Sequence, residues 1–116
     1  MERDDNLEVE KSKAIDIAKM IEYVPNTVQC KLIIKKHTGN VRVMSFDSGE
    51  TLTEKISPYD TLVQIIEGQA EIIIDTDSHQ LKLGQGIILP AHIPNIIKAS
   101  GRTKMMFTVI KSGYDI

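Results

Sequence analysis

The feature that most constrains this chain is a series of short β-branched and apolar runs, with turn residues at intervals of roughly 8–12 residues. The runs recur from residue 28 onward, and Gly, Pro, Asn, Asp or Ser stands between neighbouring runs. Short runs bounded by such residues are typical of strands, and many of them at regular spacing are typical of a sandwich or a barrel. The sequence therefore predicts an all-β fold with little helix.

The first strands form a predicted hairpin. Residues 28–36 and 41–46 are rich in Val, Ile and Phe and flank the turn Thr38-Gly39-Asn40, which is a hairpin pattern. Further strands are expected at residues 62–66, 70–75, 79–83, 87–89, 96–98 and 105–110.

The N-terminal residues differ from the rest. Residues 1–12 are charged and have almost no apolar periodicity, so we expect a flexible tail there. In residues 13–24, Ile17, Ile21 and Val24 fall on one helical face before Pro25, which locally favours a short helix. Residues 13–116 are enough for a single domain with one core.

Charge and cysteine content exclude several classes of function. There are 14 Lys and Arg against 16 Asp and Glu, a net charge of −2, so no overall attraction to nucleic acid or an anionic membrane is expected. A single cysteine, Cys30, rules out an internal disulfide, and its apolar surroundings predict a buried, inert thiol. No apolar stretch is long enough to span a bilayer, and the polar, acidic start is unlike a signal peptide, so we expect a cytoplasmic protein.

Two sets of spaced residues resemble the motifs of the cupin family. Gly49 and Gly68 match the ends of the first motif, which reads Gly, five residues, His-x-His, three or four residues, Glu, six residues, Gly. Gly84 and Pro90 match the start of the second, which reads Gly, five residues, Pro-x-Gly, two residues, His, three residues, Asn. The resemblance is to small single-domain bacterial cupins of the RmlC-like type and runs from about residue 13 to 111. It implies a double-stranded β-helix, a jelly-roll-like barrel, with residues 13–24 packed on it as a short strand or turn.

The positions that hold metal ligands in these motifs carry other residues here. Lys55 and Ser57 stand in place of the two histidines of the first motif, Thr61 in place of its glutamate, and Asn95 in place of the histidine of the second. Divalent metals in such sites take imidazole and carboxylate ligands, and a protonated lysine repels a cation. We therefore predict no metal cofactor. His92, at the position of the second motif's glycine, is the weaker alternative as a metal ligand.

The same alignment predicts a ligand pocket inside the barrel. Residues 55, 57, 61, 63 and 65 have the same parity, and alternate residues of a strand share a face. The resemblance turns that face inward, which predicts a pocket lined by Lys55, Ser57, Thr61, Val63 and Asn95. The alternative is that these polar groups only hydrogen-bond to one another or lie at a solvated rim. If a ligand binds, the charge of Lys55 favours an anion.

A basic cluster is the other charged feature of the sequence. Lys31, Lys35, Lys36 and Arg42 lie on the first predicted hairpin, and we expect them to form a solvated face.

Three classes of function remain open at this point. The favoured one is a cupin that binds a small molecule, preferably an anion, in its barrel without a metal and without catalysing a reaction. The second is a cupin enzyme of the oxygenase, isomerase or decarboxylase class, metal-dependent or with Lys55 as acid or base; its catalytic residues are unknown. The third is a structural or interaction protein whose pocket is vestigial.

A homodimer is also expected. Small cupins often form dimers, and runs such as Ile72-Ile73-Ile74 and Ile87-Ile88-Leu89 are apolar at every position. Two-sheet packing inside one chain explains such runs, as does a partner subunit on an outer face. Residues 13–24 and the neighbouring strands are the expected contact.

Overall fold

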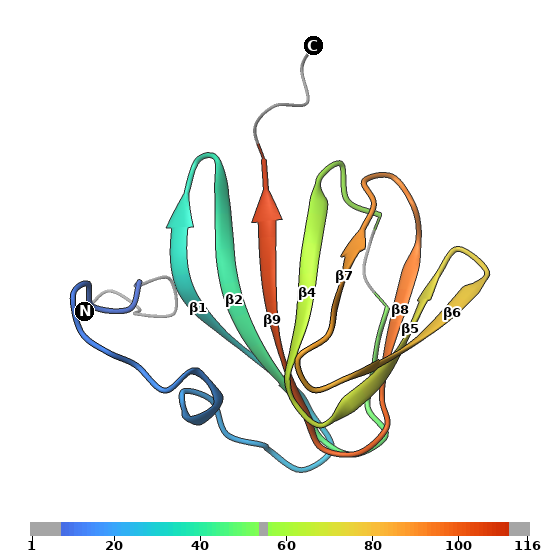
Figure 1. The fold of residues 1–116 in the computed structure, drawn as a ribbon, viewed down its shortest axis with the longest axis horizontal. Helices are drawn as coiled ribbons and strands as arrows, with labels where there is room; N and C mark the ends of the chain where they lie inside the picture. The colour runs from blue at the N-terminus through green and yellow to red at the C-terminus, as the bar shows by residue number, and fades with distance from the viewer. Residues whose placement is uncertain (1–7, 54–55, 112–116) are drawn as a thin grey trace.

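The computed structural model describes residues 8–53 and 56–111, and strands make up most of it (Figure 1). The strands are β1 Val28–Lys36, β2 Gly39–Phe46, β3 Thr51–Thr53, β4 Asp60–Glu67, β5 Gln69–Ile74, β6 Asp77–Lys82, β7 Gly86–Leu89, β8 Asn95–Ala99 and β9 Thr103–Ile110. They form a five-stranded sheet, β1-β2-β9-β4-β7, and a four-stranded sheet, β3-β8-β5-β6, with antiparallel pairing throughout. The predicted all-β fold is confirmed.

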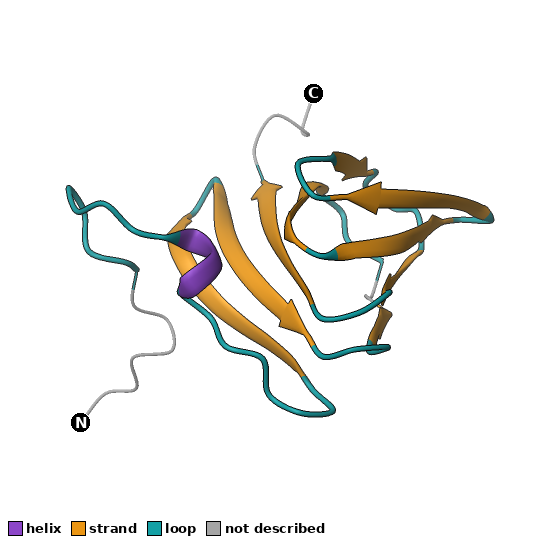
Figure 2. Ribbon diagram, turned by 60° about the horizontal axis from the view of Figure 1, so that its bottom comes forward, coloured by secondary structure: helices purple, strands orange, loops and turns teal. Residues whose placement is uncertain are grey.

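Successive strands of the chain alternate between the two sheets (Figure 2). From β2 onward every connection crosses from one sheet to the other, except the β5–β6 hairpin. Strands distant in sequence therefore become neighbours, as β4 and β9 do in one sheet and β5 and β8 in the other. This alternation is the jelly-roll pattern that the sequence predicts.

The inner faces of the two sheets meet in one core. On β4 the predicted parity is correct: Thr61, Val63 and Ile65 are 9%, 0% and 2% exposed, while Leu62 between them is 36% exposed. The core cluster contains Met44, Phe46, Val63, Ile65, Ala70, Ile72, Leu81, Leu89, Ile97, Ala99, Met105 and Phe107. The period of two in these strands thus turns one face of each sheet to the core.

The short helix that the local pattern favours for residues 13–24 does not form, whereas the packing of this segment on the barrel as a turn, which the cupin resemblance implies, is confirmed. The structure has only a single 3-10 turn, Ile17–Lys19, and the segment packs on the outer face of the five-stranded sheet. There, Ser45 Oγ donates to the Glu22 carbonyl at 2.7 Å, and Lys104 Nζ donates to the Ala18 carbonyl. Side chains of the sheet thus donate hydrogen bonds to backbone carbonyls that would accept from N–H groups within a helix. These tertiary contacts override the local helix propensity.

The end of that segment is fixed by aromatic and charged contacts. The Tyr23 hydroxyl donates to Glu67, and burial together with this hydrogen bond raises the pKa of Tyr23. Lys104 Nζ lies 4.8 Å from the centroid of the Tyr23 ring and 3.8 Å from Glu67 Oε2. Asp47 accepts a hydrogen bond from the Asn26 backbone at 2.7 Å, which lowers the pKa of its carboxyl group.

Two residues of the predicted tail contact β1. The Val9 N–H donates to the Ile33 carbonyl at 2.9 Å, and Glu8 Oε2 accepts from the Lys35 N–H at 2.7 Å. Residues 1–7 lie outside the described residues, so flexibility over residues 1–12 stays a prediction.

The outer surfaces of the strands are less covered than the sequence indicates. Cys30 is exposed, so its predicted burial is wrong; β1 is an edge strand that stands away from the four-stranded sheet (Figure 1). Leu62, Ile88 and Ile110 are 36%, 60% and 55% exposed. Packing within the chain leaves these three outward side chains of the five-stranded sheet uncovered, and the homodimer stays a prediction. In the described part of the chain, no helix is long and apolar enough to cross a membrane.

Gly68 makes the crossing from β4 to β5, and we expect Gly68→Ala to destabilise the fold. Its φ is +81°, and a Cβ atom there would lie 2.4 Å from the Arg102 carbonyl oxygen. Positive φ and this clash together predict a loss of about 2–4 kcal/mol in the free energy of unfolding. Gly101→Ala is the matched control, since a Cβ atom at Gly101 meets no atom of the described chain within 4 Å. Chemical denaturation measures the free energy of unfolding of both variants. Equal values for Gly68→Ala and Gly101→Ala would contradict the requirement for glycine at position 68.

Candidate functional site

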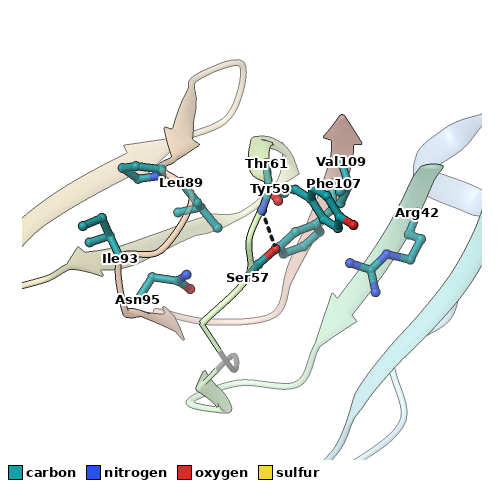
Figure 3. A pocket seen from close by; sticks show the side chains of 10 residues that line it. Arg42, Ser57, Tyr59, Thr61, Leu89, Ile93, Asn95, Phe107 and Val109 are labelled. Carbon is teal, nitrogen blue, oxygen red and sulfur yellow. Dashed lines mark hydrogen bonds between the residues drawn. The ribbon is translucent and has the colours of Figure 1, made fainter. Parts of the chain in front are cut away.

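A cavity of about 80 Å³ lies between the two sheets, at the end of the barrel where β2 and β4 begin and β9 ends (Figure 3). Its walls come from both sheets and from the loops before β4 and after β7. The lining residues are Arg42, Ser57, Tyr59, Thr61, Leu89, Pro90, Ile93, Asn95, Phe107 and Val109. The cavity therefore has an apolar wall and a small set of polar groups, as small-molecule sites commonly do.

Strand register brings Arg42 into this cavity. Arg42 on β2 pairs with Phe107 on β9, which pairs with Val63 on β4. Arg42 also has the same parity as the buried Met44 and Phe46, so it shares their inward face. Its guanidinium carbon lies 5.9 Å from the centroid of the Phe107 ring, a cation–π contact.

Two buried polar atoms of the cavity have no hydrogen-bond partner among the described residues: Arg42 Nε and Asn95 Oδ1. Arg42 comes from the five-stranded sheet and the 9%-exposed Asn95 from the four-stranded sheet, and they lie on opposite sides of the cavity (Figure 3). The buried Asn40 Oδ1, two residues from Arg42 on β2, is likewise unpartnered in the described chain. An unsatisfied buried polar group costs about 1–3 kcal/mol. These atoms are therefore a reason to expect a ligand.

Backbone hydrogen bonds hold the loop after β7 over the cavity. The Ala91 N–H donates to Asp60 Oδ1 at 2.7 Å, and the His92 N–H donates to the Ser57 carbonyl at 2.7 Å. Ser57 Oγ in turn accepts from the Tyr59 N–H at 3.1 Å (Figure 3). The loops before β4 and after β7 are thus tied to each other, which positions the cavity wall.

The structure brings together three of the five residues proposed from the sequence. Ser57, Thr61 and Asn95 line the same cavity. Val63 is 0% exposed and belongs to the core, outside the cavity lining. Lys55 lies outside the described residues.

Sequence reasoning missed Arg42 as a pocket residue. Arg42 was expected on a solvated basic face, but it points inward, while Lys35 and Lys36 lie with His37 and Lys111 at the tip of the β1–β2 hairpin. The expected basic cluster is therefore wrong for Arg42. The available signal was parity, because Arg42 alternates with the apolar Met44 and Phe46.

The residues present do not fit a transition metal. No group of three or more His, Cys, Asp or Glu residues could hold a metal ion within residues 8–53 and 56–111. The cavity offers the hydroxyls of Ser57 and Thr61 and the amide of Asn95, which are not the imidazole and carboxylate set that such metals prefer. His92 is exposed and does not line the cavity.

His92 has a positive φ of 67°, at the position where the second cupin motif has glycine. The left-handed conformation costs a residue with a Cβ atom about 1–2 kcal/mol, and glycine avoids this cost. We therefore expect His92→Gly to raise the free energy of unfolding by about 0.5–1 kcal/mol, after the greater chain entropy of glycine is subtracted. Asn26→Gly at φ 62° is the control with a smaller gain, because asparagine tolerates this conformation. A lower melting temperature for His92→Gly than for the unmodified protein in thermal denaturation would contradict the proposed backbone strain at His92.

Comparison with known proteins identifies structural relatives. No protein-family model and no curated protein matches the sequence. A conserved protein of unknown function from Streptococcus pyogenes is 28% identical, with a TM-score of 0.83 over 90% of this chain and 92% of that chain. A cupin superfamily protein from Desulfitobacterium hafniense is 26% identical, with a TM-score of 0.83 over 90% of this chain and 95% of that chain. A salicylate 1,2-dioxygenase from Pseudoaminobacter salicylatoxidans shares the fold alone, at 13% identity and a TM-score of 0.68 over 76% of this chain and 26% of that chain.

Proposed function

This chain is a small cupin-domain protein, and on that premise we propose that it binds a small anion in its barrel cavity without a metal ion. One observation carries the proposal: Arg42 Nε is buried in the cavity lining and has no hydrogen-bond partner among the described residues. A buried N–H of a charged guanidinium without an acceptor is unfavourable, and an anion supplies both the acceptor and the opposite charge.

The composition of the cavity wall supports an anion over a cation or a neutral molecule. Arg42 is the only charged side chain among the described lining residues. Ser57, Thr61 and Asn95 add hydroxyl and amide donors that can complete the shell of an oxyanion. The ligand therefore meets one fixed positive charge and neutral donors in a partly enclosed space, where electrostatic attraction is stronger than in water.

The alternative in which the polar groups only satisfy one another is not favoured. In the described chain, Arg42 Nε and Asn95 Oδ1 both lack partners although they line one cavity. The likeness to the salicylate 1,2-dioxygenase concerns the fold, and the cavity residues do not match a metal-ligand set. We therefore propose binding, as in a sensor or carrier, and not a metal-dependent reaction.

The anion proposal predicts that Arg42→Met weakens the binding of small oxyanions. A hydrogen bond to a charged group contributes about 1.5–3 kcal/mol, so we expect affinity to fall about 10-fold to 100-fold. Titration calorimetry with acetate and with inorganic phosphate measures the change, and circular dichroism confirms that the variant is folded. Lys36→Met, on the exposed tip of the same hairpin, is the matched control and should bind like the unmodified protein. Equal binding by Arg42→Met and the unmodified protein would overturn the proposal.

The metal-free part is tested on the same protein preparation. Elemental analysis of protein purified without an affinity metal should find no stoichiometric transition metal. A full equivalent of bound metal would contradict the proposal that the protein is metal-free. Anion binding by Arg42 would still be decided by the calorimetry of Arg42→Met.

A further inference from the structure

The two unpartnered groups of the cavity have opposite hydrogen-bonding character. Arg42 Nε is a donor and needs an acceptor, whereas Asn95 Oδ1 is an acceptor and needs a donor. A simple carboxylate accepts hydrogen bonds only, so it would satisfy Arg42 and leave Asn95 Oδ1 buried and unsatisfied. A ligand that matches the whole cavity therefore carries a hydrogen-bond donor in addition to its anionic group.

Cavity size restricts where that donor can be. The volume of about 80 Å³ is roughly half of the ~150 Å³ in which an apolar cavity accepts a benzene ring. The enclosed part of the ligand thus has only a few non-hydrogen atoms, about those of a carboxylate, the carbon next to it and one polar group on that carbon. In a carboxylate ligand, the donor therefore sits on that neighbouring carbon.

Charge decides between the two common donors at that position, an ammonium group and a hydroxyl group. Arg42 is the only charged side chain among the lining residues that the structure describes. An ammonium group would be buried beside a guanidinium with no carboxylate among the described lining residues to pair with it, which is unfavourable. A hydroxyl group needs only the acceptor that Asn95 offers.

We propose that the cavity binds a 2-hydroxy carboxylate, with its carboxylate on Arg42 and its hydroxyl donating to Asn95 Oδ1. The inference rests on the proposed anion binding and makes it specific. Leu89, Ile93 and Phe107 supply an apolar wall beside that carbon. Asn95 is then the residue that determines specificity, and Arg42 the residue that determines affinity for the anion.

Three ligands with one carbon skeleton test the inference. Propionate, lactate and alanine are three-carbon carboxylates that differ in the group on carbon 2: hydrogen, hydroxyl or ammonium. In titration calorimetry we expect lactate, measured as separate L and D forms, to bind about tenfold more tightly than propionate in at least one form, because its hydroxyl satisfies a buried acceptor. Alanine should bind more weakly than lactate.

A variant at Asn95 assigns the preference to its side chain. Asn95→Leu keeps a similar shape and removes the acceptor, so the affinity ratio of lactate to propionate should fall from about ten to about one. Lys36→Met, at the exposed tip of the β1–β2 hairpin and outside the cavity, is the control and should keep the ratio. The comparison of the three ligands on the unmodified protein needs no variant, so it decides the question even if Asn95→Leu does not fold.

The possible results separate this inference from the proposed function. If lactate and propionate bind the unmodified protein equally and both are lost in Arg42→Met, anion binding stands and the role of the hydroxyl is overturned. Tightest binding of alanine also overturns it. If acetate, phosphate and all three test ligands fail to bind, both the proposed function and this inference fall.

Discussion

The antiparallel register of β2, β9 and β4 decides what the inside of this barrel contains. Because side chains alternate, each row across the three strands enters the barrel or leaves it as a unit. Met44, Met105 and Ile65 form one such inward row, and the next row places Arg42 beside Phe107. A slip of one residue on β2 would expose the apolar residues and turn Arg42 outward. The core and the cavity therefore depend on the same pairing.

This register makes the cavity end of the barrel continuous with its core. Towards the β1–β2 hairpin, the inward positions of β2 change from Phe46 and Met44 to Arg42 and Asn40. The last two carry buried atoms without partners among the described residues, which lowers the stability of the free protein. Natural sequences tend to break local rules at functional sites. A ligand that pairs with Arg42 would return part of this stability on binding.

The alternation of strands and turns could be predicted from the sequence, because β-branched runs and turn residues are local signals. Parity also placed Thr61 and Ile65 on the inner face correctly. Parity with Met44 and Phe46 was also a signal that Arg42 points inward, whereas its place beside Phe107 required the pairing of β2 with β9, a contact between residues far apart in sequence. The local helical pattern of the N-terminal segment was misleading for a related reason, since Ser45 and Lys104 contact its carbonyls from the sheet, and only the cupin resemblance implied a packed turn there. Cys30 was misjudged because burial of a strand depends on its place in the sheet order.

The substitutions at the motif positions and the inward Arg42 fit one physical account. A cupin metal site places positive charge inside the barrel and needs His and Glu to hold it. Here Ser57, Thr61 and Asn95 line a cavity that already contains a guanidinium. A divalent cation in so small a space would be repelled by Arg42, and the described lining residues offer it neither an imidazole nor a carboxylate to offset that repulsion. A metal ion and Arg42 are thus alternative sources of positive charge inside the barrel. Under the proposed function this chain uses Arg42, because the charge of an arginine is permanent and its planar donors suit a carboxylate.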